Sequence, residues 1–335
     1  MSLVAVVALL TMVPASPTAA QSAWVVNATG DGSDANPGDG RCRTGSGNCT
    51  LRAAVDESNA NPGPDTITFG IAGSGVKTIT VRTPLILNDR SGGTTIDGFT
   101  QTGAQANTHA ARSNAVYTVE VTTTSQPEHM VLIESAENTI RGLSIYGNGT
   151  RIELRGEDAD GNRIVGNLIG TDATATAISS SSTNLTNAGV LFNLGPDRNI
   201  IGGPDRADRN VIARNGARGI RLNHGETSEN VIENNIIGMS PDMSEGGNQT
   251  IGIDLQWWTW GNYISNNVIS GNDWYAIDFS HSAVDNTAVD NRIGTGTGGN
   301  GGNAETANNI GIALKDNPIG NVVARNIIAN STGVG

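Results

Sequence analysis

Aromatic and basic residues are scarce in this sequence of 335 residues, and each shortage narrows what the protein can be. Aromatic residues make up 4% of the chain, so isoleucine, valine and leucine carry most of the apolar content, and the β-branched pair favours strands. Lysine and arginine number 20 against 32 acidic residues, which gives a net charge of −12. This charge disfavours nucleic acid or an anionic membrane as a partner. It would also repel an acidic polysaccharide unless calcium or local basic residues intervene.

Long apolar runs are missing outside the N-terminus. Residues 3–13 are apolar, small residues follow, and a cleavage site is plausible near Ala20, so residues 1–21 are predicted to be a signal peptide. The missing basic segment before this run is consistent with a start codon further upstream. The run is too short for a permanent membrane anchor. We therefore expect a secreted or cell-surface protein without membrane insertion.

The chain has only two cysteines, Cys42 and Cys49, in the stretch CRTGSGNC. In a secreted chain a close pair predicts a disulfide. The alternative is a metal or redox pair. A Gly/Ser loop with two thiols and no nearby histidine makes a poor metal site.

Glycine and asparagine are abundant, with 44 and 37 residues, and they punctuate a repeat. The phrase N-x-apolar-x-x-N begins at residues 162, 210, 230, 262, 286 and 321. A second phrase, G-I-x-L or a close variant, begins at residues 151, 189, 219, 252, 276 and 311. From the start of this second phrase to the next repeat asparagine the distance is 10 or 11 residues. Such regular self-similarity is typical of stacked repeat architectures.

Each repeat unit predicts three short strands with asparagine or glycine at the corners. One such coil cannot bury its apolar edge alone, but stacked coils pair every strand in parallel and bury a continuous isoleucine and valine column. The sequence therefore predicts an all-β fold, a parallel β-helix with three short strands per coil. A propeller would need hairpin turns, and none is indicated.

The N-terminal segment of residues 22–64 differs from the repeats. It has an Asp/Gly-rich loop, the cysteine pair and a predicted short helix with Leu51, Ala54 and Val55 on one face. We interpret it as the cap that a solenoid needs at its open end. Residues 65–335 form the predicted β-helix, with poorer repeats up to about residue 145. The sequence stops in mid-coil, so we expect a fragment of a longer array.

Several phrases resemble a known family. CTLRAAVDESNA at residues 49–60 is similar to the CSLREA motif of secreted bacterial β-helix proteins, with Thr50 and Ala53 departing from it. NLIGTDATAT, NIIGGPDRADRNVIARNG and NNIIGMSPD resemble repeats of large bacterial surface proteins in the pectate-lyase-like superfamily. This resemblance implies a right-handed parallel β-helix outside the cytoplasm. It does not imply one activity, because the fold hosts enzymes, adhesins and passive stalks. The polygalacturonase and alginate epimerase motifs are absent.

The third residue of G-I-x-L should point outward and stack into a column from coil to coil. The predicted column is Glu153, Leu191, Arg221, Asp254, Asp278 and Ala313. Asp254 and Asp278 should be neighbours about 4.8 Å apart, with Arg221 beside Asp254. Such carboxylates could be the acid and nucleophile of a glycosidase, or they could hold Ca²⁺. The third interpretation is a solvated charge ladder that Arg221 partly offsets.

Three residues beyond the column come His224, Trp257 and His281, again in register. Insertions at residues 170–187, 239–250 and 294–309 fall at one corner and should flank a groove over residues 219–281. Aromatic residues gather around the short corner at residues 271–274, and they are Trp257, Trp258, Trp260, Trp274, Tyr263 and Tyr275. Exposed aromatic faces of this kind usually mark a contact site. The other interpretation is that some of them plug an irregular coil.

We therefore expect a protein that binds or processes an extracellular polysaccharide or cell-surface glycan. In a catalytic reading, a lyase or hydrolase, Asp254 and Asp278 are the carboxylate pair. His224 or His281 is the acid or base, Arg221 stabilises charge, and Trp257, Trp258, Trp260, Trp274 and Tyr275 bind sugar. No cofactor is certain. The alternative is an adhesin or structural stalk without activity. Under either function we expect a monomer or part of a longer surface protein. His109 and His129 are expected to be incidental, and residues 158–160 a surface turn.

Overall fold

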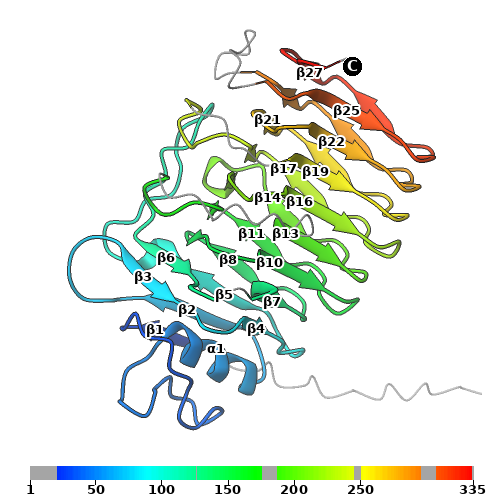
Figure 1. The fold of residues 1–335 in the computed structure, drawn as a ribbon. Helices are drawn as coiled ribbons and strands as arrows, with labels where there is room; N and C mark the ends of the chain where they lie inside the picture. The colour runs from blue at the N-terminus through cyan, green and yellow to red at the C-terminus, as the bar shows by residue number, and fades with distance from the viewer. Residues whose placement is uncertain (1–20, 126, 176–186, 245–249, 296–306, 334–335) are drawn as a thin grey trace, which may run out of the picture.

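A computed structural model describes residues 21–125, 127–175, 187–244, 250–295 and 307–333. These residues form a right-handed parallel β-helix, in which each coil contributes one strand to each of three parallel sheets (Figure 1). The predicted signal peptide lies outside the described residues except for Gln21. No described helix is long and apolar enough to cross a membrane.

The G-I-x-L phrases form the sheet with the longest strands, which we call sheet C. Its members in stacking order are β4 (Leu85–Leu87), β7 (His129–Ile133), β10 (Thr150–Arg155), β13 (Ala188–Asn193), β16 (Arg218–Asn223), β19 (Ile251–Leu255), β22 (Tyr275–Phe279) and β25 (Ile310–Leu314).

The asparagine phrases form the other two sheets. Sheet A consists of β1 (Ser22–Val26), β2 (Asp65–Phe69), β5 (Thr94–Asp97), β8 (Thr139–Arg141), β11 (Arg163–Val165), β14 (Ile200–Gly202), β17 (Val231–Glu233), β20 (Tyr263–Ser265), β23 (Thr287–Val289) and β26 (Val322–Ala324). Sheet B consists of β3 (Lys77–Thr80), β6 (Val119–Thr122), β9 (Ser144–Ile145), β12 (Leu168–Ile169), β15 (Val211–Ile212), β18 (Ile236–Ile237), β21 (Val268–Ile269), β24 (Arg292–Ile293) and β27 (Ile327–Ile328). Two short 3-10 helices, η1 (Gly98–Thr100) and η2 (Arg206–Asp208), lie in connections.

The N-terminal end of the solenoid is covered by α1 (Leu51–Ala60), which contacts β1, β2 and β4. Figure 1 shows the helix beneath the first coil. Leu51, Ala54 and Val55 are buried against the core as expected, and the hydroxyl of Thr50 caps the helix by accepting the Ala53 N–H. The helix therefore closes the apolar column at this end.

The loop before α1 is fixed by a disulfide and by a buried carboxylate. Cys42 and Cys49 are bonded, which confirms the disulfide. The carboxylate of Glu57, which is fully buried in α1, accepts the backbone N–H groups of Gly38 and Gly40. Both features hold this loop, which has no regular secondary structure, against α1.

The interior is a continuous column of isoleucine, valine and leucine that follows the three sheets. Sheet B also carries an apolar cluster on its outer face. Leu168, Val211 and Ile236 begin successive strands there and pack with Tyr117, Met239 and Met243 from the connections. In the last described coil Val323 and Ile328 are 40% and 48% exposed, whereas their register partners Ala288 and Ile293 are buried.

The corner asparagines form hydrogen-bonded ladders along the stack. Asn262 illustrates the pattern, because its Oδ1 accepts the backbone N–H and the side-chain amide of Asn230, both at 3.0 Å. Its own N–H and amide donate to Asn286 Oδ1 at 3.0 and 2.9 Å. All three side chains are fully buried. Each asparagine thus satisfies backbone groups at a corner where the sheet pattern is interrupted.

Asn262→Ala is expected to lower the free energy of unfolding by about 2 to 4 kcal/mol, because it leaves buried donors of Asn230 without an acceptor. Urea denaturation followed by far-UV circular dichroism measures the change. Asn36→Ala, at an exposed position of the cap loop, is the control. A loss no larger than that of the control would contradict a stabilising role for the ladder.

Candidate functional site

The predicted outward column on sheet C is confirmed. Its members occupy register positions on successive strands, and they are Glu153, Leu191, Arg221, Asp254, Asp278 and Ala313. In β19, Ile253 and Leu255 are fully buried in the core. Asp254 lies between them and therefore points to the outer face.

The strands of sheet C bend at their first residues. A Cβ placed on Gly252 would lie 2.7 Å from Cγ2 of the core residue Ile269, so this position faces inward, as Ile253 does after it. The position before the bend, Ile251, consequently faces outward. Its register partners are Arg218 and Tyr275, which brings both of these side chains beside the column.

Arg218 is the direct counter-ion of Asp254. Arg218 Nε forms an ion pair with Asp254 Oδ2. Arg221 lies in register with Asp254, as expected, but donates to Gln256 Oε1 at 2.9 Å. Arg221 still interacts with the charge of Asp254, as expected, but the direct ion pair comes from Arg218. Strict alternation of side chains along a strand does not include the bend at the start of these strands, and this bend brings Arg218 next to Asp254.

Asp278 has a cation of its own from the next coil. Lys315 Nζ lies 2.8 Å from Asp278 Oδ2 and also 4.3 Å from the centre of the Tyr275 ring. Burial raises the pKa of Asp278 to about 6, and the charge of Asp254 adds to this rise, while Lys315 and Arg218 oppose it. Asp254 and Asp278 are both 0% exposed. The predicted pair is thus adjacent but lies beneath its cations.

The three predicted corner residues share an unusual backbone. His224, Trp257 and His281 have φ values of 73°, 56° and 49°, in the left-handed region. The rings of Trp257 and His281 stack with centroids 4.6 Å apart. His224 is exposed, and no ring contact or hydrogen bond of its side chain occurs among the described residues. The structure therefore pairs His281 with a tryptophan rather than with His224.

The six aromatic residues that the sequence grouped together lie in separate places. Trp274 stacks on Tyr275 at the start of β22, with centroids 4.7 Å apart. Trp257 and Trp258 follow β19 at the opposite end of the strands, with centroids 6.1 Å apart. These four residues therefore flank the aspartates along the strand direction.

The other two aromatic residues turn away from this face. Trp260 pairs with Ser228 and Val284 in the corner that leads to sheet A, and Tyr263 lies on β20 of sheet A. Tyr275 is 8% exposed and supports Trp274 rather than offering a ring of its own. The predicted insertions at residues 170–187 and 294–309 fall mostly outside the described residues, and the insertion at residues 239–250 does so for residues 245–249.

A polar network further toward the N-terminus was missed by the sequence reasoning. His129 Nδ1 lies 3.1 Å from Glu153 Oε2, and Arg155 Nε donates to Glu153 Oε1 at 2.7 Å. His129, expected to be incidental, is thus a buried neighbour of the Glu153 carboxylate. The predicted outward column could have indicated this network, because Glu153 is its first member and His129 is the first residue of the preceding strand.

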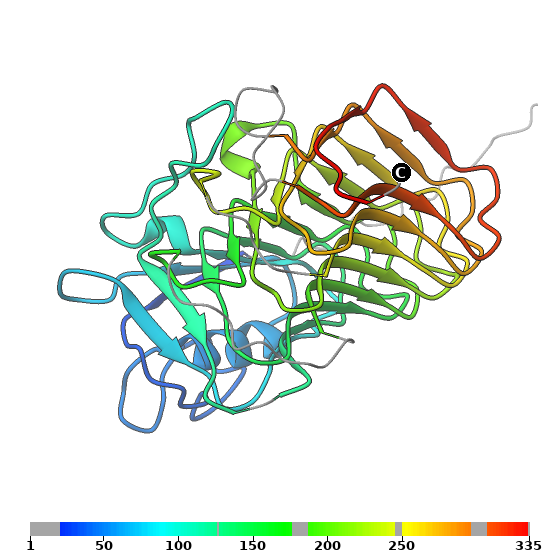
Figure 2. The same ribbon diagram turned by 45° about the horizontal axis from the view of Figure 1, so that its top comes forward.

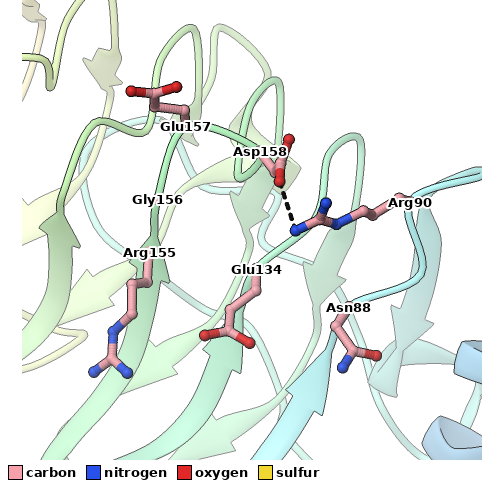
Figure 3. A pocket seen from close by; sticks show the side chains of 7 residues that line it. All are labelled: Asn88, Arg90, Glu134, Arg155, Gly156, Glu157 and Asp158. Atoms are coloured by element: carbon pink, nitrogen blue, oxygen red, sulfur yellow. Dashed lines mark ion pairs between the residues drawn. The ribbon is translucent and has the colours of Figure 1, made fainter.

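This network borders a pocket of about 370 Å³ on the same face of the solenoid (Figure 3). Its lining residues are Asn88, Arg90, Glu134, Arg155, Gly156, Glu157 and Asp158. Asp158 pairs with Arg90, and Asp160 with Arg198, as suits the surface turn expected there. In the described part of the chain, no group of three His, Cys, Asp or Glu side chains is arranged to hold a metal ion.

Comparison with known proteins finds remote structural similarities. No protein-family model matches the chain, and no curated protein matches it. A mutant of the periplasmic alginate epimerase AlgG aligns with 80% of this chain and 71% of its own, at 11% identity and a TM-score of 0.37. ORF18 of Geobacillus virus E2 aligns with 69% of this chain and 50% of its own, at 12% identity and a TM-score of 0.28. Both TM-scores are low, and the fold assignment rests on the three parallel sheets.

The stability of the protein is expected to fall as pH rises from about 4 to about 6. The folded state holds the Asp278 proton up to about pH 6, whereas an unfolded aspartate releases it near 3.8. The folded state thus binds more protons in this window, and the free energy of unfolding decreases by roughly 2 to 3 kcal/mol as pH rises through it.

Asp278→Asn should flatten this slope, and urea denaturation at several pH values measures it. Asp65, whose pKa burial also raises to about 6, keeps part of the slope in the variant. Glu226→Gln, at an exposed site, is the surface-charge control. An unchanged slope in Asp278→Asn would show that Asp278 is ionised throughout the window.

Proposed function

We propose that the protein binds an extracellular polysaccharide along the outer face of sheet C. The observation that carries this proposal is the exposure of tryptophan at both ends of β19 and β22. Trp257, Trp258 and Trp274 are 43%, 57% and 45% exposed, whereas Trp24 in the cap is buried. Large aromatic faces left in solvent favour a contact site over a structural plug.

The surroundings of these rings suit a sugar chain. Sugar rings combine apolar faces with many hydroxyl groups, so they need flat apolar surfaces next to hydrogen-bonding side chains. Arg221 and Lys315, which are partly exposed, supply such polar groups on the outer face between the tryptophans. A mostly apolar surface with a few oriented polar groups is the usual composition of a ligand site.

The burial of the two aspartates favours binding over cleavage as the function. Asp254 and Asp278 are fully buried and each is ion-paired, so they hold Arg218 and Lys315 in place at the surface. Buried charges of this kind fix the geometry of their partners. The two carboxylates are thus proposed to organise the binding face.

Cleavage of the same polysaccharide is a second candidate, and one observation favours it. The pKa of Asp278 is raised to about 6, near the range that suits a general acid, and Asp254 is its neighbour. In this reading His281 or His224 exchanges protons and Arg221 stabilises charge. Arg218 and Lys315 would have to move before a substrate could reach the carboxylates.

Location outside the cytoplasm belongs to the proposal as well. The Cys42–Cys49 disulfide supports an oxidising compartment. The apolar N-terminal run at residues 3–13 supports secretion. A surface adhesin or stalk with no glycan ligand is the outcome that the following experiment would reveal.

Trp257→Ala/Trp258→Ala and Trp274→Ala are each expected to weaken glycan binding at least tenfold, because stacking surface is lost at one end of the face. A glycan array followed by tryptophan fluorescence titration measures binding. Tyr263→Ala, which removes an equally exposed aromatic residue from sheet A, is the control.

Reducing-sugar and unsaturated-product assays on wild type and Asp254→Ala/Asp278→Ala separate cleavage from binding. Product formation that is lost in the aspartate variant would favour the enzyme. Absence of both binding and turnover on every polysaccharide tested would favour the stalk.

A further inference from the structure

The pocket near the N-terminal end has a floor built in register from three strands of sheet C. Leu87, Ile133 and Leu154 pair across β4, β7 and β10. Asn88 and Glu134 directly follow β4 and β7, and Arg155 ends β10, so these three residues lie side by side on the outer face, as Figure 3 shows. The ion pair between Arg90 and Asp158, at 2.7 Å, closes one side of the pocket.

Arg155 is held in place from below. Glu153, which is 1% exposed, accepts Arg155 Nε at 2.7 Å and the Asn193 amide at 3.1 Å. Its other oxygen lies 3.1 Å from His129 Nδ1. These hydrogen bonds keep the pKa of Glu153 low despite its burial, so the carboxylate stays charged. The guanidinium is therefore oriented before any ligand arrives, which reduces the entropy lost on binding.

The floor also has unused hydrogen-bonding capacity. No hydrogen bond or ion pair joins the side chains of Glu134 or Asn88 to any described residue, and the same holds for Nη1 of Arg155. Glu134 offers acceptors, Arg155 offers donors, and the Asn88 amide offers both. A ligand that matches this floor must carry donors and acceptors close together.

The charges of the pocket exclude a strongly anionic ligand. The carboxylates of Glu134, Glu157 and Asp158 outnumber the guanidinium groups of Arg90 and Arg155, and Arg155, which also attracts Glu134, is already ion-paired with Glu153. A uronate or sulfate group would face this excess of negative charge. Among the described residues no three His, Cys, Asp or Glu side chains are arranged to hold a metal ion. Neighbouring hydroxyl groups of an uncharged sugar both donate and accept, so they match the floor without charge repulsion.

We infer that this pocket binds one unit of a neutral polysaccharide and is a subsite of the surface that carries the tryptophans. The inference rests on the proposed function for its ligand class. From β10, which supplies Arg155, to β19, which precedes Trp257, is three strand steps, or about 14 Å. One oligosaccharide that runs along the solenoid axis contacts both sites.

Calorimetric titration with cellohexaose, xylohexaose, mannohexaose and hexagalacturonate, and with the matching disaccharides, tests the inference. At least one neutral hexasaccharide is expected to bind. Glu134→Gln/Asn88→Ala should weaken its binding at least tenfold, because the floor loses a charged acceptor and an amide. Glu137→Gln, an exposed site on the same turn that does not line the pocket, is the matched control.

The disaccharides separate the pocket from the tryptophans. A neutral disaccharide should lose affinity in the pocket variant and keep it in Trp257→Ala/Trp258→Ala. If the disaccharide behaves in this way and the tryptophan variant binds the hexasaccharide as well as wild type does, the pocket would be supported. The same outcome would count against the proposed tryptophan surface. Binding that depends on the tryptophans and ignores the pocket variant would overturn the inference and leave the proposed function standing.

Three further outcomes would also overturn it. Preferential binding of hexagalacturonate would show that the pocket accepts acidic sugars. Binding abolished by EDTA and restored by calcium would make the carboxylates metal ligands. Failure of all neutral probes to bind wild type would exclude the ligand class.

Discussion

Parallel pairing in strict register is the constraint on which the rest of the structure depends. Each strand bonds to its equivalent one coil before and one coil after, so whatever side chain occupies a position meets its own equivalent about 4.8 Å away. Inside, the repetition is favourable, since isoleucine stacks on isoleucine. At the corners it is favourable for asparagine, because Asn230, Asn262 and Asn286 each supply the acceptor that the previous coil requires. The repeat in the sequence follows from this requirement that equivalent positions match from coil to coil.

The same constraint makes charge on the outer face costly. Asp254 and Asp278 are neighbours because their strands are neighbours, and neither can move away along the sheet. Cations from other positions resolve the repulsion, with Arg218 on the preceding coil and Lys315 on the following one. The pKa of Asp278 remains raised, mainly by burial and to a smaller degree by the charge of Asp254. The register of the strands thus places the two aspartates side by side and also determines which positions can supply their counter-ions.

The sequence predicts the coils and the outward column because both depend only on spacing. It does not predict the partners of the aspartates, since strict alternation places Arg218 toward the interior and only the bend at Gly252 brings that row outward. It also does not predict the separation of the tryptophans, because a linear segment that turns a corner exposes side chains on two faces. His129 was missed for a related reason. Its partner Glu153 is 24 residues away in the chain and adjacent only through the stack.

The unequal length of the strands explains why sheet C carries both candidate sites. Sheet B has strands of two residues over most of its length, and its outer face is covered by the cluster around Tyr117 and Met239. Sheet C has strands of five or six residues from β7 onward, which stack in parallel along the solenoid (Figure 2). Its outer face therefore presents several parallel rows of side chains. Each row of side chains repeats from coil to coil along the solenoid axis. A polymer with its own repeat can therefore contact equivalent positions in successive coils. An extended ligand therefore gains more contacts on sheet C than on sheet B, and the polar floor and the exposed tryptophans both lie there.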